Sequence, residues 1–392
     1  MDELVRRYLL LALRLGRHVP SFLLAYVGPP GLREALDGED PTPARELHDE
    51  SMRLAELVVG ALGPDATRAG WLRAQLQAMG ALARTIDGEE IGYLDLVEEL
   101  YDVRLEREPL DTFVAAHRML DAALPAGPGL RERLAAHEAA TALASLDGLA
   151  AVRRLADLLR RRTAQDLWLP DGESVEFIES SIEFAYLGGF RSVVGAALDR
   201  PMSLRRVVEL AAGQTYPGRH AERAVKEAVL MREHGFDEAA VTCRFTPEAV
   251  ISGGIAAVGR EVVLTDQELA VELGRIGRAA GVRIDADREL AVARAREHLA
   301  PALANAAIGL HHEGAPVREV RDELGEVALL DSAALDVEMR RLAHPLSRAD
   351  PVTRFAGARL VREWLQVQGQ THGLSRLLAE QLTPGRLRSE AA

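Results

Sequence analysis

The stretch LAAGQTYPGRH, residues 210–220, interrupts a run of helical sequence. Apolar residues recur at helical spacing over residues 203–212 before it and over residues 218–234 after it. The Tyr-Pro-Gly between them is a turn, because Pro217 suits the first turn of a helix and cannot continue the preceding one. The sequence therefore predicts two helices that meet at one turn, with His220 just beyond it.

Helical periodicity also dominates the rest of the chain. Clusters of glycine and proline that a helix cannot easily cross, at residues 28–30, Gly63-Pro64 and residues 125–128, separate some of the helical stretches. The predicted helical stretches are residues 42–62, 65–86, 109–123, 129–162, 284–312 and 352–368.

One region has a different pattern. Pro170-Asp171-Gly172 is a turn signal, and Val175 and Phe177 begin an extended segment. Residues 190–198 are the predicted partner strand. We therefore predict a mainly α fold with a small β element near residues 173–198. The predicted division is an N-terminal helical half, residues 1–165, and a C-terminal half, residues 166–392, that carries the turn.

Composition excludes several classes of function. The chain has 392 residues and a formal net charge of -13, and this acidic excess disfavours binding to nucleic acid. Its single cysteine, Cys243, allows no internal disulfide and is expected to be a small buried apolar residue. No glycine-rich phosphate loop and no GxSxG nucleophile motif occurs in the sequence.

The N-terminal sequence MDELVRRYLLLALRLGRH is apolar, but Arg14 and Arg17 interrupt it. No small-residue cleavage site follows, and no stretch reaches the roughly 18 apolar residues of a membrane span. The segment is predicted to be an amphipathic helix. These features predict a cytoplasmic protein without a membrane partner.

Several short segments together resemble a family of bacterial α-helical proteins related to zinc-dependent peptidases, whose signature reads HEAYPGHH. The likeness covers most of the chain and implies a multi-helix, zincin-peptidase-like fold. It is carried by GQTYPGRH at residues 213–220, RYLLLALRLGRHVPSFLLAYVGPP at 7–30, GEEIGYLDLVEELYDV at 88–103, LPDGESVE at 169–176, YLGGFRS at 186–192, NAAIGLHHEG at 305–314 and LLAEQLTP at 377–384.

The resemblance implies zinc-assisted hydrolysis, but this chain lacks the residues for it. Gly213 stands in place of the first histidine, Gln214 in place of the catalytic glutamate, and Arg219 in place of another histidine. Gly253, in SGGIA, replaces a second glutamate, so that only His220 remains. Glutamine cannot accept a proton from water, and one histidine is fewer than the three protein ligands of a typical catalytic zinc site. We therefore expect no metal and no cofactor.

Two functions follow from this reading. The first is a catalytically inactive, metal-free relative of a zinc metallopeptidase that binds a peptide, a small anionic molecule or a partner protein in the former cleft. The second is a metal-independent enzyme in which Arg219, His220 and Tyr216 act on a carboxylate-bearing substrate. The residues predicted to line the cleft are Gln214, Tyr216, Arg219, His220 and Gly253. The oligomeric state stays open.

Three geometric expectations accompany these functions. The β element should lie beside the helix that begins near Pro217, and His220 is expected to be a hydrogen-bonded or an exposed side chain. The side chains missing at Gly213 and Gly253 should leave a cavity. Arg219 should find a carboxylate, either Glu222 or another acid of the protein, or else bind an anionic ligand.

Overall fold

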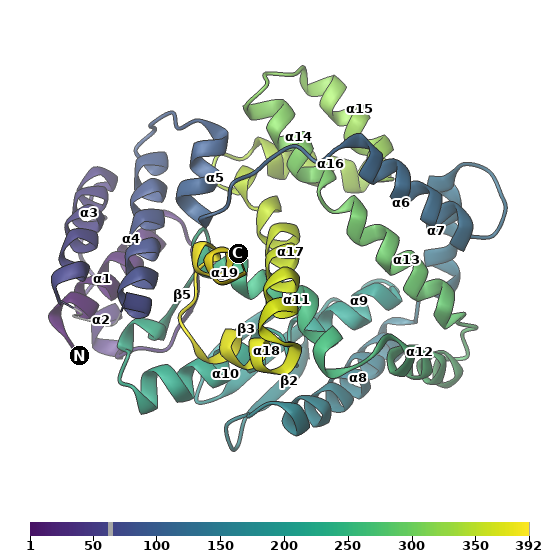
Figure 1. Cartoon of the computed structure of the whole chain (residues 1–392), viewed down its shortest axis with the longest axis horizontal. Helices are drawn as coiled ribbons and strands as arrows, with labels where there is room; N and C mark the ends of the chain where they lie inside the picture. The colour runs from purple at the N-terminus through teal and green to yellow at the C-terminus, as the bar shows by residue number, and fades with distance from the viewer. Residues whose placement is uncertain (62–65, 392) are drawn as a thin grey trace.

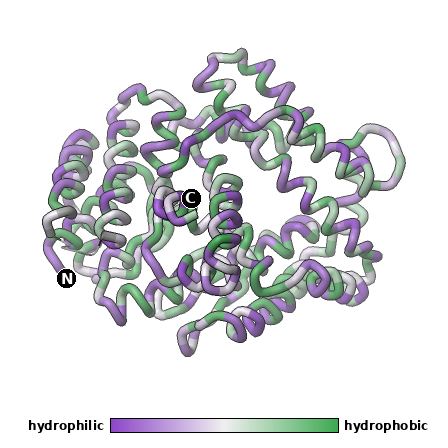
Figure 2. The backbone as a smooth tube through the Cα atoms, viewed as in Figure 1, coloured by the Kyte–Doolittle hydropathy of each residue, from purple (hydrophilic) through white to green (hydrophobic). Residues whose placement is uncertain are grey.

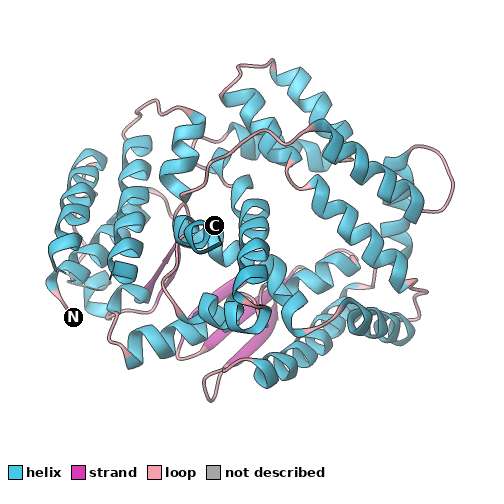
Figure 3. Ribbon diagram, viewed as in Figure 1, coloured by secondary structure: helices cyan, strands magenta, loops and turns pink. Residues whose placement is uncertain are grey.

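The computed structural model of the chain describes residues 1–61 and 66–391, and the predicted break at Gly63-Pro64 lies outside them (Figure 1). The fold is mainly helical, as predicted from the periodicity (Figure 3). The helices before the β element are α1 Glu3–His18, α2 Pro30–Glu34, α3 Ala44–Ala61, α4 Ala66–Ile86, α5 Tyr93–Tyr101, α6 Leu110–Ala123, α7 Leu130–Thr141 and α8 Ser145–Asp166.

The helices after the β element include two π-helical segments, η1 and η2, and two short 3-10 turns, η3 and η4. In chain order they are α9 Leu204–Val208, η1 Glu209–Gly213, α10 Arg219–Lys226, η2 Glu227–Glu233, η3 Asp237–Ala240, α11 Pro247–Val263, α12 Asp266–Ala280, α13 Ala286–Leu299, α14 Ala302–His311, α15 Val317–Val327, α16 Ser332–Ala343, η4 Ser347–Ala349, α17 Pro351–Gln368, α18 Gln370–Ala379 and α19 Pro384–Ala391.

Two predicted helical stretches were wrong in length. Residues 129–162 form two helices, α7 and α8, because Leu143 leaves the helical path and exchanges two 2.8 Å backbone hydrogen bonds with Met202. Residues 284–312 also form two helices, α13 and α14. Here the break falls before Pro301, which has no N–H to donate and would clash with the preceding turn of a continuous helix.

The β element is a three-stranded sheet of order β2-β4-β3, formed by β2 Ser174–Glu179, β3 Phe184–Gly188 and β4 Arg191–Ala196 (Figure 3). The predicted pairing of the extended segment at Val175 and Phe177 with residues 190–198 is confirmed: β2 pairs with β4, and the pairing is parallel. β3 pairs with β4 antiparallel through a tight turn that contains Gly189 at φ 62°. A second sheet, β1 Leu23–Tyr26 with β5 Val241–Cys243, was not predicted, because strands of four and three residues are too short to show a period.

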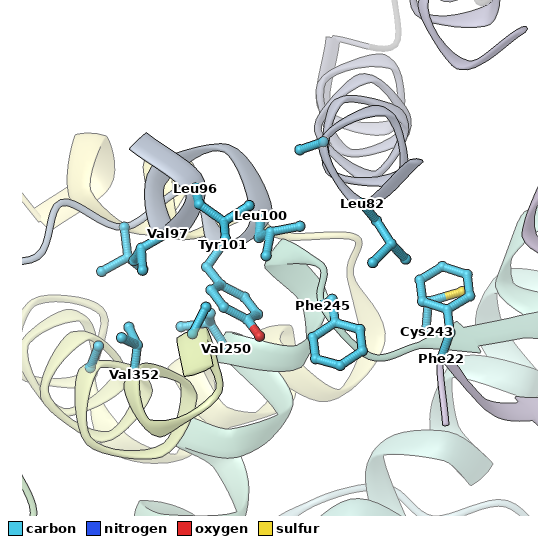
Figure 4. Packing of buried hydrophobic residues seen from close by; sticks show 14 of the residues in the cluster. Phe22, Leu82, Leu96, Val97, Leu100, Tyr101, Cys243, Phe245, Val250 and Val352 are labelled. Atoms are coloured by element: carbon cyan, nitrogen blue, oxygen red, sulfur yellow. The ribbon is translucent and has the colours of Figure 1, made fainter. Parts of the chain in front are cut away.

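The buried apolar residues form two clusters. Hydrophobic (green) and hydrophilic (purple) segments alternate along the helices in Figure 2. The first cluster joins α1, α3–α6 and β5 to helices α13–α16 and the start of α17. Figure 4 shows part of it, with Leu82 of α4 near Phe245 and Tyr101 of α5 near Val250 of α11. The buried Cys243 belongs to this cluster, as expected.

The second cluster contains α8–α12, β4, most of α17 and helices α18 and α19. It surrounds the turn quoted from the sequence, because Tyr216 and Ala221 are among its members. Each cluster contains helices from both sides of the predicted boundary at residue 166. Helix α8, before the boundary, belongs to the second cluster, and helices α13–α16, after it, belong to the first. The division into residues 1–165 and 166–392 stays a prediction.

Helices α11 and α17 cross at close range through glycines. A β-carbon at Gly357 would lie 2.2 Å from the carbonyl oxygen of Val250 and 2.9 Å from the amide nitrogen of Gly254. A β-carbon at Gly254 would lie 2.4 Å from the carbonyl oxygen of Gly357. The backbones of the two helices therefore touch, and no larger residue fits at either position without separating them.

The variant Gly357→Ala is expected to lower the free energy of unfolding by about 1–3 kcal/mol, because α11 and α17 must move apart. Urea denaturation followed by circular dichroism measures this change. Gly274→Ala is the matched control, since its β-carbon would meet only the end of Arg278, at 3.6 Å. That variant should be more stable by about 0.5–1 kcal/mol. Equal effects of the two variants would contradict the close crossing.

Candidate functional site

The quoted stretch folds into a compact turn between η1 and α10. The Tyr216–Pro217 peptide bond is cis, and α10 begins at Arg219. The amide of Gly218 donates to the carbonyl of Ala212 (3.1 Å). A β-carbon at Gly218 would lie 2.2 Å from the carbonyl oxygen of Gly213, so this position requires glycine.

His220 is fully buried and holds α10 against the sheet. Its Nδ1 lies 2.8 Å from the hydroxyl of Ser192 on β4, and its Nε2 lies 2.9 Å from Oε2 of Glu173. Both ring nitrogens therefore have partners, which confirms the expectation of a hydrogen-bonded histidine. The expected position of the β element beside this helix is also confirmed.

Glu173 is the centre of this group, although sequence reasoning did not select it. Its Oε2 also accepts a hydrogen bond from the hydroxyl of Tyr216, and its Oε1 accepts one from Nε of Arg160 (2.5 Å). Burial raises the pKa of Glu173, but the hydrogen bonds from His220, Tyr216 and Arg160 lower it to below its usual value. The signal for it in the sequence is the segment LPDGESVE, in which Glu173 directly follows the turn Pro170-Asp171-Gly172.

Ser192, His220 and Glu173 have the residue types of a catalytic triad, yet substrate cannot reach them. Their exposed fractions are 2%, 0% and 5%, and Ser192 lies within the central strand of the sheet. A nucleophile must contact the reacting atom of its substrate. The group is therefore a buried connection between a helix and a sheet.

A second buried polar group lies on the other side of α10. Nζ of Lys226 lies 2.7 Å from Glu222 and 3.0 Å from Glu248 of α11. Arg223 donates to Glu248 (3.0 Å) and to the hydroxyl of Ser252 (3.2 Å). Burial raises the pKa of the Glu248 carboxyl. The charges of Arg223 and Lys226 have the opposite and larger effect, so the pKa is lowered to about 2.

Two positive and two negative side chains thus compensate one another in this group. The sequence carried one unused signal for it, because Lys226 is the only lysine of the chain. Glu222 accepts hydrogen bonds from Lys226 and Ser252 and does not bind Arg219. It was one of the partners expected for Arg219.

Arg219 has no hydrogen-bond or ion-pair partner among the residues that the structure describes. Its side chain is partly buried. Burial lowers the pKa of Arg219, and the charges of Arg223 and Arg354 lower it further, while Glu222 opposes them. Gln214, five residues earlier, is buried and its Oε1 accepts no hydrogen bond from the described part of the protein.

The expected cavity at the two glycines is not found at either position. A β-carbon at Gly213 would lie 3.1 Å from the carbonyl oxygen of Ala256, and one at Gly253 would lie 3.0 Å from that of Thr353. Backbone of α11 and α17 thus stands where larger side chains would project. The neighbouring helices have closed on the glycines. Without this collapse, the missing side chains would leave a void.

Zinc does not fit the residues of this turn. The side chains at Gly213 and Gly253 supply no ligand atom, and the positive charge of Arg219 would repel a metal ion. Both nitrogens of His220 are occupied by Ser192 and Glu173. Elsewhere in the described ranges, no three His, Cys, Asp or Glu side chains are placed to hold a metal ion.

Comparisons with known proteins find similarity in fold alone. No family model and no curated protein matches the chain. A solved "putative lipoprotein" from Colwellia psychrerythraea is 13% identical, with a TM-score of 0.52 over 92% of this chain and 69% of that one. A "putative lipoprotein of unknown function" from Shewanella oneidensis is 9% identical, with a TM-score of 0.52 over 91% of this chain and 75% of that one.

These neighbours contradict the cytoplasmic location predicted from the N-terminal sequence. Both are described as lipoproteins, a class of protein that a covalent lipid holds at a membrane. In the part of the chain that the structure describes, no helix is long and apolar enough to cross a bilayer. The prediction failed because it rested on the lack of a signal and of a spanning segment, and a lipid anchor needs no spanning helix.

Proposed function

We propose that this protein is a catalytically inactive, metal-free relative of a zinc metallopeptidase, with a multi-helix fold of that type, and that it binds an anionic ligand at Arg219. The observation that carries the proposal is the partly buried Arg219, which has no partner among the described residues. A guanidinium that loses water without gaining an anion is costly, so an anionic ligand would stabilise it.

The ligand group that suits this position is a carboxylate. The planar guanidinium of Arg219 offers parallel N–H donors that match the two oxygens of a carboxylate. Gln214 adds an amide within the same turn, and its unpaired Oε1 can accept a hydrogen bond from an N–H group of the ligand. A small carboxylic acid and the end of a peptide both present this combination.

The residues available for hydrolysis support binding over catalysis. Gln214 cannot act as a general base, and both ring nitrogens of His220 already form hydrogen bonds, with Ser192 and Glu173. The alternative, a metal-independent enzyme that uses Arg219, His220 and Tyr216, has less support. Two of these three side chains, Tyr216 and His220, are hydrogen-bonded to the buried Glu173.

The test is titration calorimetry of the wild type and of Arg219→Ala with N-acetylglycine, which presents a carboxylate and an amide, and with its neutral amide. We expect N-acetylglycine alone to bind, and Arg219→Ala to weaken this binding by about 10-fold or more, as loss of a charged hydrogen bond does. Zn²⁺ titrated into the wild type should show no stoichiometric binding.

Arg318→Ala is the control, because that side chain is 93% exposed and its ion pair with Asp322 is 3.9 Å long. It should bind N-acetylglycine as the wild type does. Equal affinities of wild type and Arg219→Ala, or one zinc ion per chain, would refute the proposal.

A further inference from the structure

A cavity of about 780 Å³ lies far along the chain from the Arg219 turn, between α7, the loop that precedes it and the connection of α12 to α13. Its size is within the range of small-molecule sites in proteins. Arg133, Arg283 and Arg288 line it together with His137. Only two acidic residues, Glu132 and Asp285, are among its lining residues. A chain with a net charge of -13 thus has a locally positive cavity here.

Two of the four basic side chains are fixed by the protein itself. Arg133 forms an ion pair with Asp121 and donates to the carbonyl of Pro125 (3.4 Å), which holds the preceding loop in place. Arg288 donates to the carbonyl of Ala123 (3.0 Å) and lies 3.1 Å from Asp285. These two arginines build the wall of the cavity and leave their neighbours to contact a ligand.

The other two basic side chains have unused polar atoms. Among residues 1–61 and 66–391, Arg283 has no hydrogen-bond or ion-pair partner. The side chain of His137 is 93% buried, and its Nε2 lies 2.9 Å from a carboxylate oxygen of Glu289 without forming a hydrogen bond within the described protein. A buried ring nitrogen that lacks a hydrogen bond in the wall of a cavity is satisfied by water or by a ligand.

The backbone that carries Arg283 is fixed on both sides. Gly281 ends α12 in the left-handed conformation at φ 67°, and the amide of Val282 donates to the carbonyl of Gly277 (2.8 Å). Asp285 then caps the start of α13. Arg283 is therefore presented from a constrained connection, which lowers the entropic cost of binding.

We propose that this cavity binds a small organic anion, with its carboxylate or phosphate group on Arg283 and His137 and its apolar part on Ala136, Ala140 and Ile284. Nothing in this site depends on the turn at Arg219, so it is a second site, independent of the function proposed above. The apolar residues of the lining favour an anion with a hydrocarbon body over an inorganic ion.

The experiment is calorimetric titration of the full chain with benzoate and with phenyl phosphate, which distinguish the two anionic groups. Benzamide is the neutral match of benzoate, and inorganic phosphate is the match without a hydrocarbon body. We expect at least one of the two aromatic anions to bind, and benzamide and inorganic phosphate to bind at least 10-fold more weakly.

Arg283→Ala should weaken the binding of that anion about 10-fold or more, and Ala140→Phe should abolish it by filling the cavity without changing its charge. Arg278→Ala removes an exposed arginine of α12 that does not line the cavity, and it should bind as the wild type does. Arg219→Ala should also bind as the wild type does, which separates this site from the first. Binding that survives both Arg283→Ala and Ala140→Phe, or the absence of binding by both anions, would overturn the proposal.

Discussion

Replacing Lys226 with methionine is expected to lower the free energy of unfolding by about 3–5 kcal/mol. Methionine has a similar length and leaves no large void, so the loss comes from charge. Glu222 and Glu248 lie 2.7 Å and 3.0 Å from the amine, and both carboxylates are buried. Without Lys226 they share the single positive charge of Arg223, which leaves one negative charge uncompensated. Urea denaturation followed by circular dichroism measures the change.

The matched test for this explanation is the double variant Lys226→Met with Glu248→Gln. It removes one charge of each sign and leaves Glu222 with Arg223, whose charged atoms lie 3.6 Å apart. The double variant should therefore be more stable than Lys226→Met alone, since the effects on stability of substitutions at contacting residues are not additive. Arg318→Met, at an exposed ion pair, should change stability by less than about 0.5 kcal/mol. Additive losses in the double variant would show that volume, and not charge, decides the effect.

Local pattern predicted the helices well and their interruptions poorly. The start of α17 and the end of α6 fall within a residue of the prediction, because apolar residues recur there at helical spacing up to a proline or a turn. The break at Leu143 could not be predicted in this way. Its cause is a pair of hydrogen bonds with Met202, 59 positions along the chain, and no local pattern encodes that contact.

The turn around Pro217 was predicted from local residues, but its chemistry was not. His220 was recognised as a candidate and its partners were missed, because Glu173 and Ser192 come from segments 47 and 28 residues away. The absence of metal ligands at Gly213 and Gly253 could be read from the sequence. The closing of α11 and α17 over those glycines depends on how helices pack, and the prediction of a cavity failed there.

The second large effect is expected for Glu173→Gln, which should lower the free energy of unfolding at neutral pH by about 2–4 kcal/mol. Glutamine matches the size of glutamate but carries one oxygen and one NH₂ group. Whichever way the amide turns, its donor faces either Arg160 or the pair formed by Tyr216 and His220, all of which donate to Glu173 in the wild type. At least one buried hydrogen bond to the charged carboxylate is then lost, and in its place the NH₂ group of the glutamine faces another hydrogen-bond donor.

The pH dependence of this difference tests its cause. The pKa of Glu173 is lower in the folded protein than its ordinary value of 4.5, so its carboxylate stabilises the fold above pH 4.5. That stabilisation is lost as the pH falls below 4.5 and through the folded pKa, because the protonated acid, like glutamine, no longer offers two charged oxygens. The stabilities of wild type and Glu173→Gln, measured by urea denaturation at a series of pH values, should therefore converge on acidification. Glu176 lies in β2, three residues after Glu173, and it is exposed and has no ion pair or hydrogen bond within the described residues. Glu176→Gln should therefore stay within about 0.5 kcal/mol of the wild type at every pH. A difference for Glu173→Gln that does not shrink in acid would mean that this carboxylate is not the charged centre that joins α10 to the sheet.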